Sequence, residues 1–290
     1  VEREGVLPLL IGLFSALYAA IGSMASLGLT PEQALPVVLF LNFAHAMPME
    51  VAVAYRCRVS PWRITAARLA MAVMAAMMAP LFVPLLPPTA PAAAGSWLGP
   101  AVSDPADQAS LPAIAIFGQG LRGLGRLLLL LVLILAPVTL AMEVLERRGL
   151  LDRWSNRVEP YVNRFGLSGE ATFPILAGLF LGLVYGAGVL IDRMNRRRLS
   201  EQEAWRVFLF LGACHSVLED PFIFTAVGVG PHILLPVRLM AGGLVLGGLA
   251  LVAARRPISG GIASATRRYI LRPAAKAHLR RAGAPGQRPR

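Results

Sequence analysis

Apolar residues are grouped along this chain in long runs that shorter polar segments separate. The runs 127–138 and 234–254 contain almost no charged residue, and they approach or reach the roughly 20 residues that a helix needs to cross a bilayer. Hydrophobic residues make up 56% of the chain and charged residues only 15%, whereas a soluble domain carries about 25% charged residues. The pattern predicts an all-α, polytopic membrane protein.

The second half of the chain repeats the polar pattern of the first. Residues 30–70 align without a gap on residues 200–240, at a constant offset of 170. The aligned pairs include a histidine, a carboxylic acid and an arginine: His45 with His215, Glu50 with Asp220, and Arg68 with Arg238. Apolar similarity alone does not place three such polar pairs in one register, so the sequence indicates a duplicated unit.

Each half is expected to contain a glycine-rich hairpin followed by two transmembrane helices. The hairpins are predicted at about 5–28 and 171–195, the first helices at about 32–56 and 202–227, and the second helices at about 62–86 and 232–254. The expected order of domains is a first repeat (1–86), an extracytoplasmic loop (87–122), a linking transmembrane helix with an amphipathic interfacial helix (123–170), a second repeat (171–254) and a basic cytoplasmic tail (255–290).

The distribution of arginine predicts that the two halves have opposite orientations. In the first half, Arg56, Arg58 and Arg63 lie between the two helices, whereas the matching connection in the second half has no basic residue. There the arginines, at 193–198, instead precede the first helix. Cytoplasmic connections are enriched in Lys and Arg, so the halves form inverted repeats. All the arginine-rich connections lie on the cytoplasmic side only if each glycine-rich segment is re-entrant, so that it enters the membrane and returns on the same side. The chain is therefore expected to be a multi-pass protein of the inner (plasma) membrane with its C-terminus in the cytoplasm.

The formal net charge of +12 does not indicate a nucleic-acid partner. Ten basic residues and no acid lie in the segment 255–290, directly after an apolar run, where the positive-inside rule places them. The expected partners are the lipid bilayer, a small solute or cation, and further copies of the chain in a homo-oligomer. Cys57 and Cys214 form no CxxC pattern, so no disulfide framework or zinc finger is expected.

Ionisable residues at predicted membrane depth are the candidate functional residues. Such groups are costly in a bilayer and are usually functional. Glu219 follows His215 by four residues, which places both on the same helical face. Related by a pseudo-two-fold axis, the first helices of the two halves bring these side chains to one central place: His45, Glu50, His215, Glu219 and Asp220. Pro48 and Pro221 lie beside them and can open the helix backbone.

Three interpretations of this group remain open. In the first, His45, Glu50, His215 and Asp220 bind a divalent metal ion, with Cys214 as a soft ligand. In the second, histidine and carboxylate form a proton relay. In the third, the two acids pair with Arg68 and Arg238 and only fix one helix to the next. No cofactor is required, and a divalent metal ion is the one candidate.

Tyr185 and Gly186 lie in the second glycine-rich segment, where they either pack closely or mark a bend that meets substrate. The chain has no Walker loop, GxSxG, HExxH or Rossmann glycine pattern, so no enzyme is expected. Uphill transport would need an ion gradient or a partner.

Three stretches resemble the nucleoside recognition, or Gate, domain family. They are 149–170, 178–190 with Gly178, Gly182 and Gly186, and Leu211 to Asp220. The family is named from concentrative nucleoside transporters and includes Feo-type ferrous-iron transporters and spore-maturation membrane proteins. The resemblance covers about 115–245 and extends to 5–75 through the repeat. It implies an interfacial helix, a re-entrant hairpin and membrane helices, in that order.

The expected function is transport of a small solute or cation through a central His/carboxylate site, with proton or metal linkage. A non-transporting membrane scaffold of the spore-maturation type is the alternative, and a nucleoside permease is the third.

Overall fold

The computed structural model describes residues 3–86, 112–217 and 219–255. All regular secondary structure in these ranges is helical, which confirms the all-α prediction. Residues 87–111 of the predicted loop and residues 256–290 of the predicted basic tail lie outside the described residues. Helix α9 (Ala113–Arg147) begins ten residues before the linking helix predicted from 123, so residues 113–122 are helical and not part of a loop.

The first half contains a helical hairpin and a broken helix followed by a bent one. Its elements are η1 (Arg3–Gly5), α1 (Val6–Phe14), α2 (Leu17–Ser26), α3 (Pro31–Leu41), α4 (Met47–Arg56), α5 (Pro61–Met77), α6 (Ala79–Phe82) and η2 (Val83–Leu85). Helices α1 and α2 pack against each other, and α3 packs against α5. The chain bends by 52° between α5 and the segment Ala79–Leu85.

After a linking region, the second half repeats the order of the main helices of the first, which is a helical pair, a broken helix and a long helix. Helix α9 is followed by α10 (Leu150–Asn163), η3 (Gly169–Ala171), α11 (Thr172–Leu181), α12 (Leu183–Asn195), α13 (Glu201–Ala213), α14 (Glu219–Ile223), η4 (Phe224–Val227) and α15 (Pro231–Arg255). Again the first two helices of the half, α11 and α12, pack against each other, and α13 packs against α15.

Helices α3 and α13 begin with the same capping device. Thr30 and Gln33 form a capping box at the start of α3, and Ser200 and Glu203 form one at the start of α13. A capping box satisfies two of the backbone N–H groups that a helix start leaves without a partner. Both helices therefore start at equivalent positions of the repeat.

The predicted continuous helices 32–56 and 202–227 are wrong, because each is broken near its histidine. Helix α3 ends at Leu41 and α4 begins at Met47, whereas α13 ends at Ala213 and α14 begins at Glu219. Pro48 stands in the first turn of α4, where its missing N–H is harmless and where it disfavours helical backbone before it.

Equivalent backbone geometry is found at the two breaks. Ala46 and Ser216 have left-handed backbone angles, with φ of 48° and 45°. The N–H of Ala46 donates to the carbonyl of Gly12 at 2.8 Å, and that of Ser216 donates to the carbonyl of Gly178 at 3.3 Å. Each break is thus held by the first helix of the hairpin in its own half.

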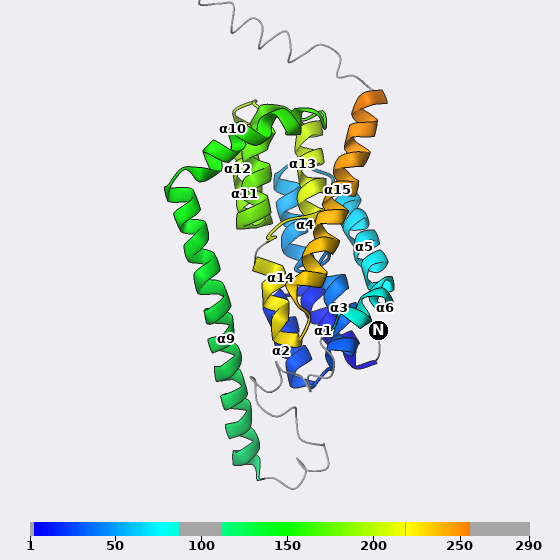
Figure 1. Ribbon diagram of the computed structural model, residues 1–290, viewed down its shortest axis with the longest axis vertical. Coiled ribbons are helices and arrows are strands. Elements are labelled where there is room, and N and C mark those ends of the chain that lie inside the picture. The colour runs from blue at the N-terminus through cyan, green and yellow to red at the C-terminus, as the bar shows by residue number, and fades with distance from the viewer. Residues whose placement is uncertain (1–2, 87–111, 218, 256–290) are drawn as a thin grey trace, which may run out of the picture.

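The hairpin α1/α2 and the hairpin α11/α12 lie toward opposite ends of the long axis of the molecule, with the broken helices between them (Figure 1). Helix α9 runs along one side and contacts α10 and α14. Two apolar cores fill the interior, and each takes residues from both halves. Phe224 and Ile233 join the core around α3, whereas Ala54 and Ile64 join the core around α13.

Within the part of the chain that the structure describes, one helix, Pro231–Val252, is long and apolar enough to cross a membrane by itself. The bent pair formed by α5 and Ala79–Leu85 passes the same test when it is counted as one span.

Candidate functional site

The two histidines lie in the breaks rather than in the middle of continuous helices. Nδ1 of His45 lies 2.7 Å from the carbonyl oxygen of Leu41, and Nδ1 of His215 lies 2.8 Å from that of Leu211. A carbonyl only accepts, so each Nδ1 carries the proton and donates it to this bond. When the ring is neutral, this leaves its Nε2 atom as an acceptor with a free lone pair.

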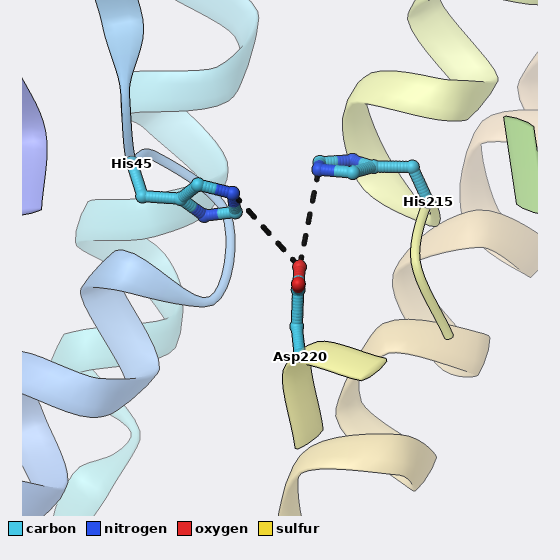
Figure 2. Close-up of side chains that lie close together, drawn as sticks. All are labelled: His45, His215 and Asp220. Carbon is cyan, nitrogen blue, oxygen red and sulfur yellow. Dashed lines mark ion pairs between the residues drawn. The ribbon is translucent and has the colours of Figure 1, made fainter. Parts of the chain in front are cut away.

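Both Nε2 atoms face the same carboxylate (Figure 2). Oδ2 of Asp220 lies 3.9 Å from Nε2 of His45 and 3.9 Å from Nε2 of His215. The ring centroids are 5.5 Å apart. We refer to His45, His215 and Asp220 as the histidine–aspartate cluster; one ligand atom from each lies within 4.8 Å of the others. At 3.9 Å these contacts exceed hydrogen-bond length, so a small space remains between the three groups.

Each buried carboxylate is paired with the arginine of its own half. Glu50 forms an ion pair with Arg68, and Oδ2 of Asp220 accepts from Nη2 of Arg238 at 2.7 Å. Oε1 of Glu50 also lies 3.8 Å from Nε2 of His215. Two carboxylates and two guanidinium groups, taken as ionised, give a net charge of zero around the two neutral imidazoles.

The arginines also satisfy backbone carbonyls that the helix breaks leave free. Arg68 donates from Nε to the carbonyl of Phe43 at 2.7 Å. Arg238 donates to Asn42 twice, to the side-chain Oδ1 at 2.8 Å and to the carbonyl at 2.6 Å, and also to the carbonyl of His215. Both arginines are 0% exposed. A buried carbonyl without a partner is costly, so these guanidinium groups stabilise the breaks as well as the acids.

Asn42 is a central residue that the sequence comparison does not single out. Its counterpart in the repeat is Gly212, whose position faces the side chain of Arg68. Because the alignment of the two halves pairs Asn42 with a glycine, it does not mark Asn42 as a functional residue. A polar residue in an apolar run is the only sign that could have identified it.

Four of the residues singled out from the sequence lie outside both the histidine–aspartate cluster and the two acid–arginine pairs. Glu219 accepts a hydrogen bond from the hydroxyl of Tyr18 at 2.5 Å. The break separates it from the helix of His215, so the two do not share a helical face. Cys214 is buried against the Gly242 position of α15.

The other two residues belong to α12. Tyr185 lines a pocket of about 640 Å³ together with Phe173, Asp192 and several arginines. Gly186 packs against the backbone of Gly178, where an added Cβ would lie 2.5 Å from its Cα. This contact shows that Gly186 allows α11 and α12 to approach closely.

Comparison with known proteins extends these observations. Residues 128–229 match the Gate family, described as Nucleoside recognition; we call this range the Gate-type segment. It contains most of α9 and continues through α10–α14. The chain is 28% identical over 244 residues to an uncharacterized membrane protein of Bacillus subtilis (strain 168), YvoD, and this match covers 81% of the chain and 73% of the relative. No solved structure matches the chain. These matches support a membrane protein with a Gate-type segment.

Proposed function

We propose that this membrane protein is a transporter that moves a small solute or cation through a site between two inverted halves. Its Gate-type segment matches a kind of domain that is associated with membrane transporters. The observation that carries the proposal is the convergence of His45 and His215, from equivalent breaks of the two halves, on Asp220. The proposed location is the inner membrane, with a cytoplasmic C-terminus and assembly into a homo-oligomer.

The lengths of the helices support re-entrant hairpins. Helices α1 and α2 have 9 and 10 residues, so at about 1.5 Å per residue each extends about 15 Å. This is half of the roughly 30 Å hydrocarbon thickness of a bilayer. A hairpin of this size enters and returns on the same side. Helices α3 and α4 together have 21 residues, 11 plus 10, enough for one broken crossing.

The position of the two hairpins toward opposite ends of the molecule supports an inverted arrangement (Figure 1). The hydrogen bonds from Ala46 to Gly12 and from Ser216 to Gly178 place each hairpin against the break of its own half. Non-helical backbone at membrane depth is tolerated only where it is buried in protein or lines a cavity. Transporters of the inverted-repeat class use such discontinuous helices to build their central sites.

The site is closed in this structure. Asp220 is 6% exposed, His215 3% and His45 8%. A solute therefore reaches the cluster only when one half moves relative to the other, as in alternating access.

Uptake into proteoliposomes tests the proposal. The purified protein is reconstituted and offered Zn²⁺, Mn²⁺ and uridine in separate assays, with His45→Gln/His215→Gln as the test variant and His232→Gln as the matched control. His232 is exposed and lies outside the cluster. We expect uptake of one solute by the wild type and the control, and a loss of at least tenfold in the double variant. Equal uptake by all three proteins, or by protein-free liposomes, would refute the central-site transporter.

A non-transporting membrane scaffold is the second candidate. The pairs Glu50–Arg68 and Asp220–Arg238 favour it, because both fix one helix to another without any need for a solute. Under this function, Glu50→Gln and Asp220→Asn lower stability, and the wild type shows no uptake in the same assay. The uridine arm tests the third candidate, a nucleoside permease.

A further inference from the structure

We propose that the histidine–aspartate cluster binds one divalent transition-metal ion of the class that accepts imidazole nitrogen, such as Zn²⁺ or Co²⁺, and that this ion is the transported solute. The inference rests on the proposed function and specifies its substrate class. Two imidazole nitrogens and one carboxylate oxygen form a donor set that suits these ions, whereas Mg²⁺ and Ca²⁺ prefer oxygen ligands alone.

The spacing of the three ligand atoms is close to that of a metal site. An ion with bonds of about 2.0–2.2 Å in a tetrahedral arrangement separates its ligand atoms by about 3.4 Å. The distances from Asp220 Oδ2 to the two Nε2 atoms are each 3.9 Å. Side-chain movements of about half an ångström would therefore bring the carboxylate oxygen to this spacing from each imidazole nitrogen. The two imidazole nitrogens lie within 4.8 Å of each other, so this third distance would close by at most about 1.4 Å.

The hydrogen bonds behind the histidines are those of metal ligands. A histidine that binds metal through one ring nitrogen nearly always donates the other N–H to a carbonyl or carboxylate, which fixes its tautomer and orientation. His45 makes this bond to Leu41 and His215 makes it to Leu211. Both rings are thus oriented with Nε2 toward Asp220.

Size also favours an ion. The groups that would contact the solute are buried, and their ligand atoms lie within 4.8 Å of one another. A bare ion fits in this space with small adjustments. A solute with a sugar ring would require the two breaks to separate by several ångströms.

The neighbouring charges set the expected affinity. Arg68 and Arg238 already balance Glu50 and Asp220, and Arg238 shares the oxygen that would bind the ion. A divalent ion therefore adds two uncompensated positive charges to a buried site, so binding is weaker than in structural zinc sites. Weak binding agrees with transport, which requires that the ion leave again.

The test is a titration of the purified full-length protein in detergent with Co²⁺, prepared without a histidine tag and followed by visible d–d absorption and by competition with Zn²⁺. We expect one Co²⁺ per chain and an increase in dissociation constant of at least tenfold in His45→Gln, in His215→Gln and in Asp220→Asn. His232→Gln is the control and should bind as the wild type does. Circular dichroism and size-exclusion chromatography show which variants fold.

Two results would overturn the inference: no saturable Co²⁺ absorption in the wild type, or an unchanged isotherm in folded His45→Gln/His215→Gln protein. The outcome is separate from that of the uptake assay. Uptake of uridine without Co²⁺ binding would leave a transporter and remove the metal, whereas Co²⁺ binding without any uptake would leave the metal site and remove the transporter.

Discussion

The Nε atom of Arg238 lies 2.8 Å from Oδ1 of Asn42, although the two residues are 196 positions apart and belong to different halves of the repeat. Both side chains are almost fully buried. Arg238 also donates to the backbone carbonyl of Asn42, so one guanidinium group joins α15 to the break of the first half.

Asn42→Ala should lower stability. The substitution leaves Nε of Arg238 buried without an acceptor, which costs about 1–3 kcal/mol. Thermal unfolding in detergent measures the change, with Ser26→Ala as the control, because Ser26 bonds only locally at an exposed position. An unfolding temperature for Asn42→Ala equal to that of the control would show that this contact contributes nothing.

Glu50→Gln should be among the most destabilising single substitutions. It leaves Arg68, which is fully buried, without its counter-charge, and breaking a buried pair in this way costs about 3–5 kcal/mol. Glu143→Gln, which disrupts the exposed pair with Arg147, should change stability by less than about 1 kcal/mol.

The double substitution Glu50→Met/Arg68→Met removes both buried charges and should recover part of the loss. If its loss of stability instead equals the sum of the losses in Glu50→Met and Arg68→Met, the two side chains do not interact energetically. Chemical denaturation in mixed micelles, compared across the four proteins, gives this coupling.

Gly186→Ala and Gly188→Ala form a matched pair within α12. A Cβ at Gly186 would meet the backbone of Gly178, whereas a Cβ at Gly188 would meet nothing within 4 Å. Overpacking should cost about 1–3 kcal/mol at position 186, and the better helix propensity of alanine should give up to about 1 kcal/mol at position 188. Opposite shifts of the unfolding temperature are the expected result, and equal shifts would contradict the close approach of α11 and α12.

Tyr18→Phe should weaken the contact between the first hairpin and the second break. The hydroxyl of Tyr18 donates to Glu219 of α14, and loss of such a bond at a partly exposed site costs about 1 kcal/mol. Tyr55→Phe, at a strongly exposed tyrosine of α4, is the control. Hydrogen exchange should rise in α14 only in the first variant; exchange that stays the same would mean that α14 is held by its other contacts.

The sequence predicted the helical class, and it offered the pairing of each acid with the arginine of its own half as one of three open interpretations. The repeat register was sufficient for this, since Glu50 and Arg68, like Asp220 and Arg238, lie on neighbouring helices of one unit. What it did not predict is the break in each first helix. Residues 42–46 contain neither glycine nor proline to end a helix, and the left-handed backbone at Ala46 is held by tertiary contact with Gly12 rather than by local preference.

The error in the position of Glu219 has the same origin. On a continuous helix it would follow His215 by one turn, but the break turns α14 away and Glu219 meets Tyr18 instead. The partnership of Arg238 with Asn42 could not be predicted either, because no periodicity connects residues so far apart and the repeat counterpart of Asn42 is a glycine.

The mixing of both halves in each apolar core has a consequence for the chain if it is cut between the repeats. The N-terminal fragment would lack Phe224 and Ile233, and the C-terminal fragment would lack Ala54 and Ile64. Neither fragment could complete an interior alone. Co-produced fragments should resist proteolysis only after they associate, and each produced singly should be degraded.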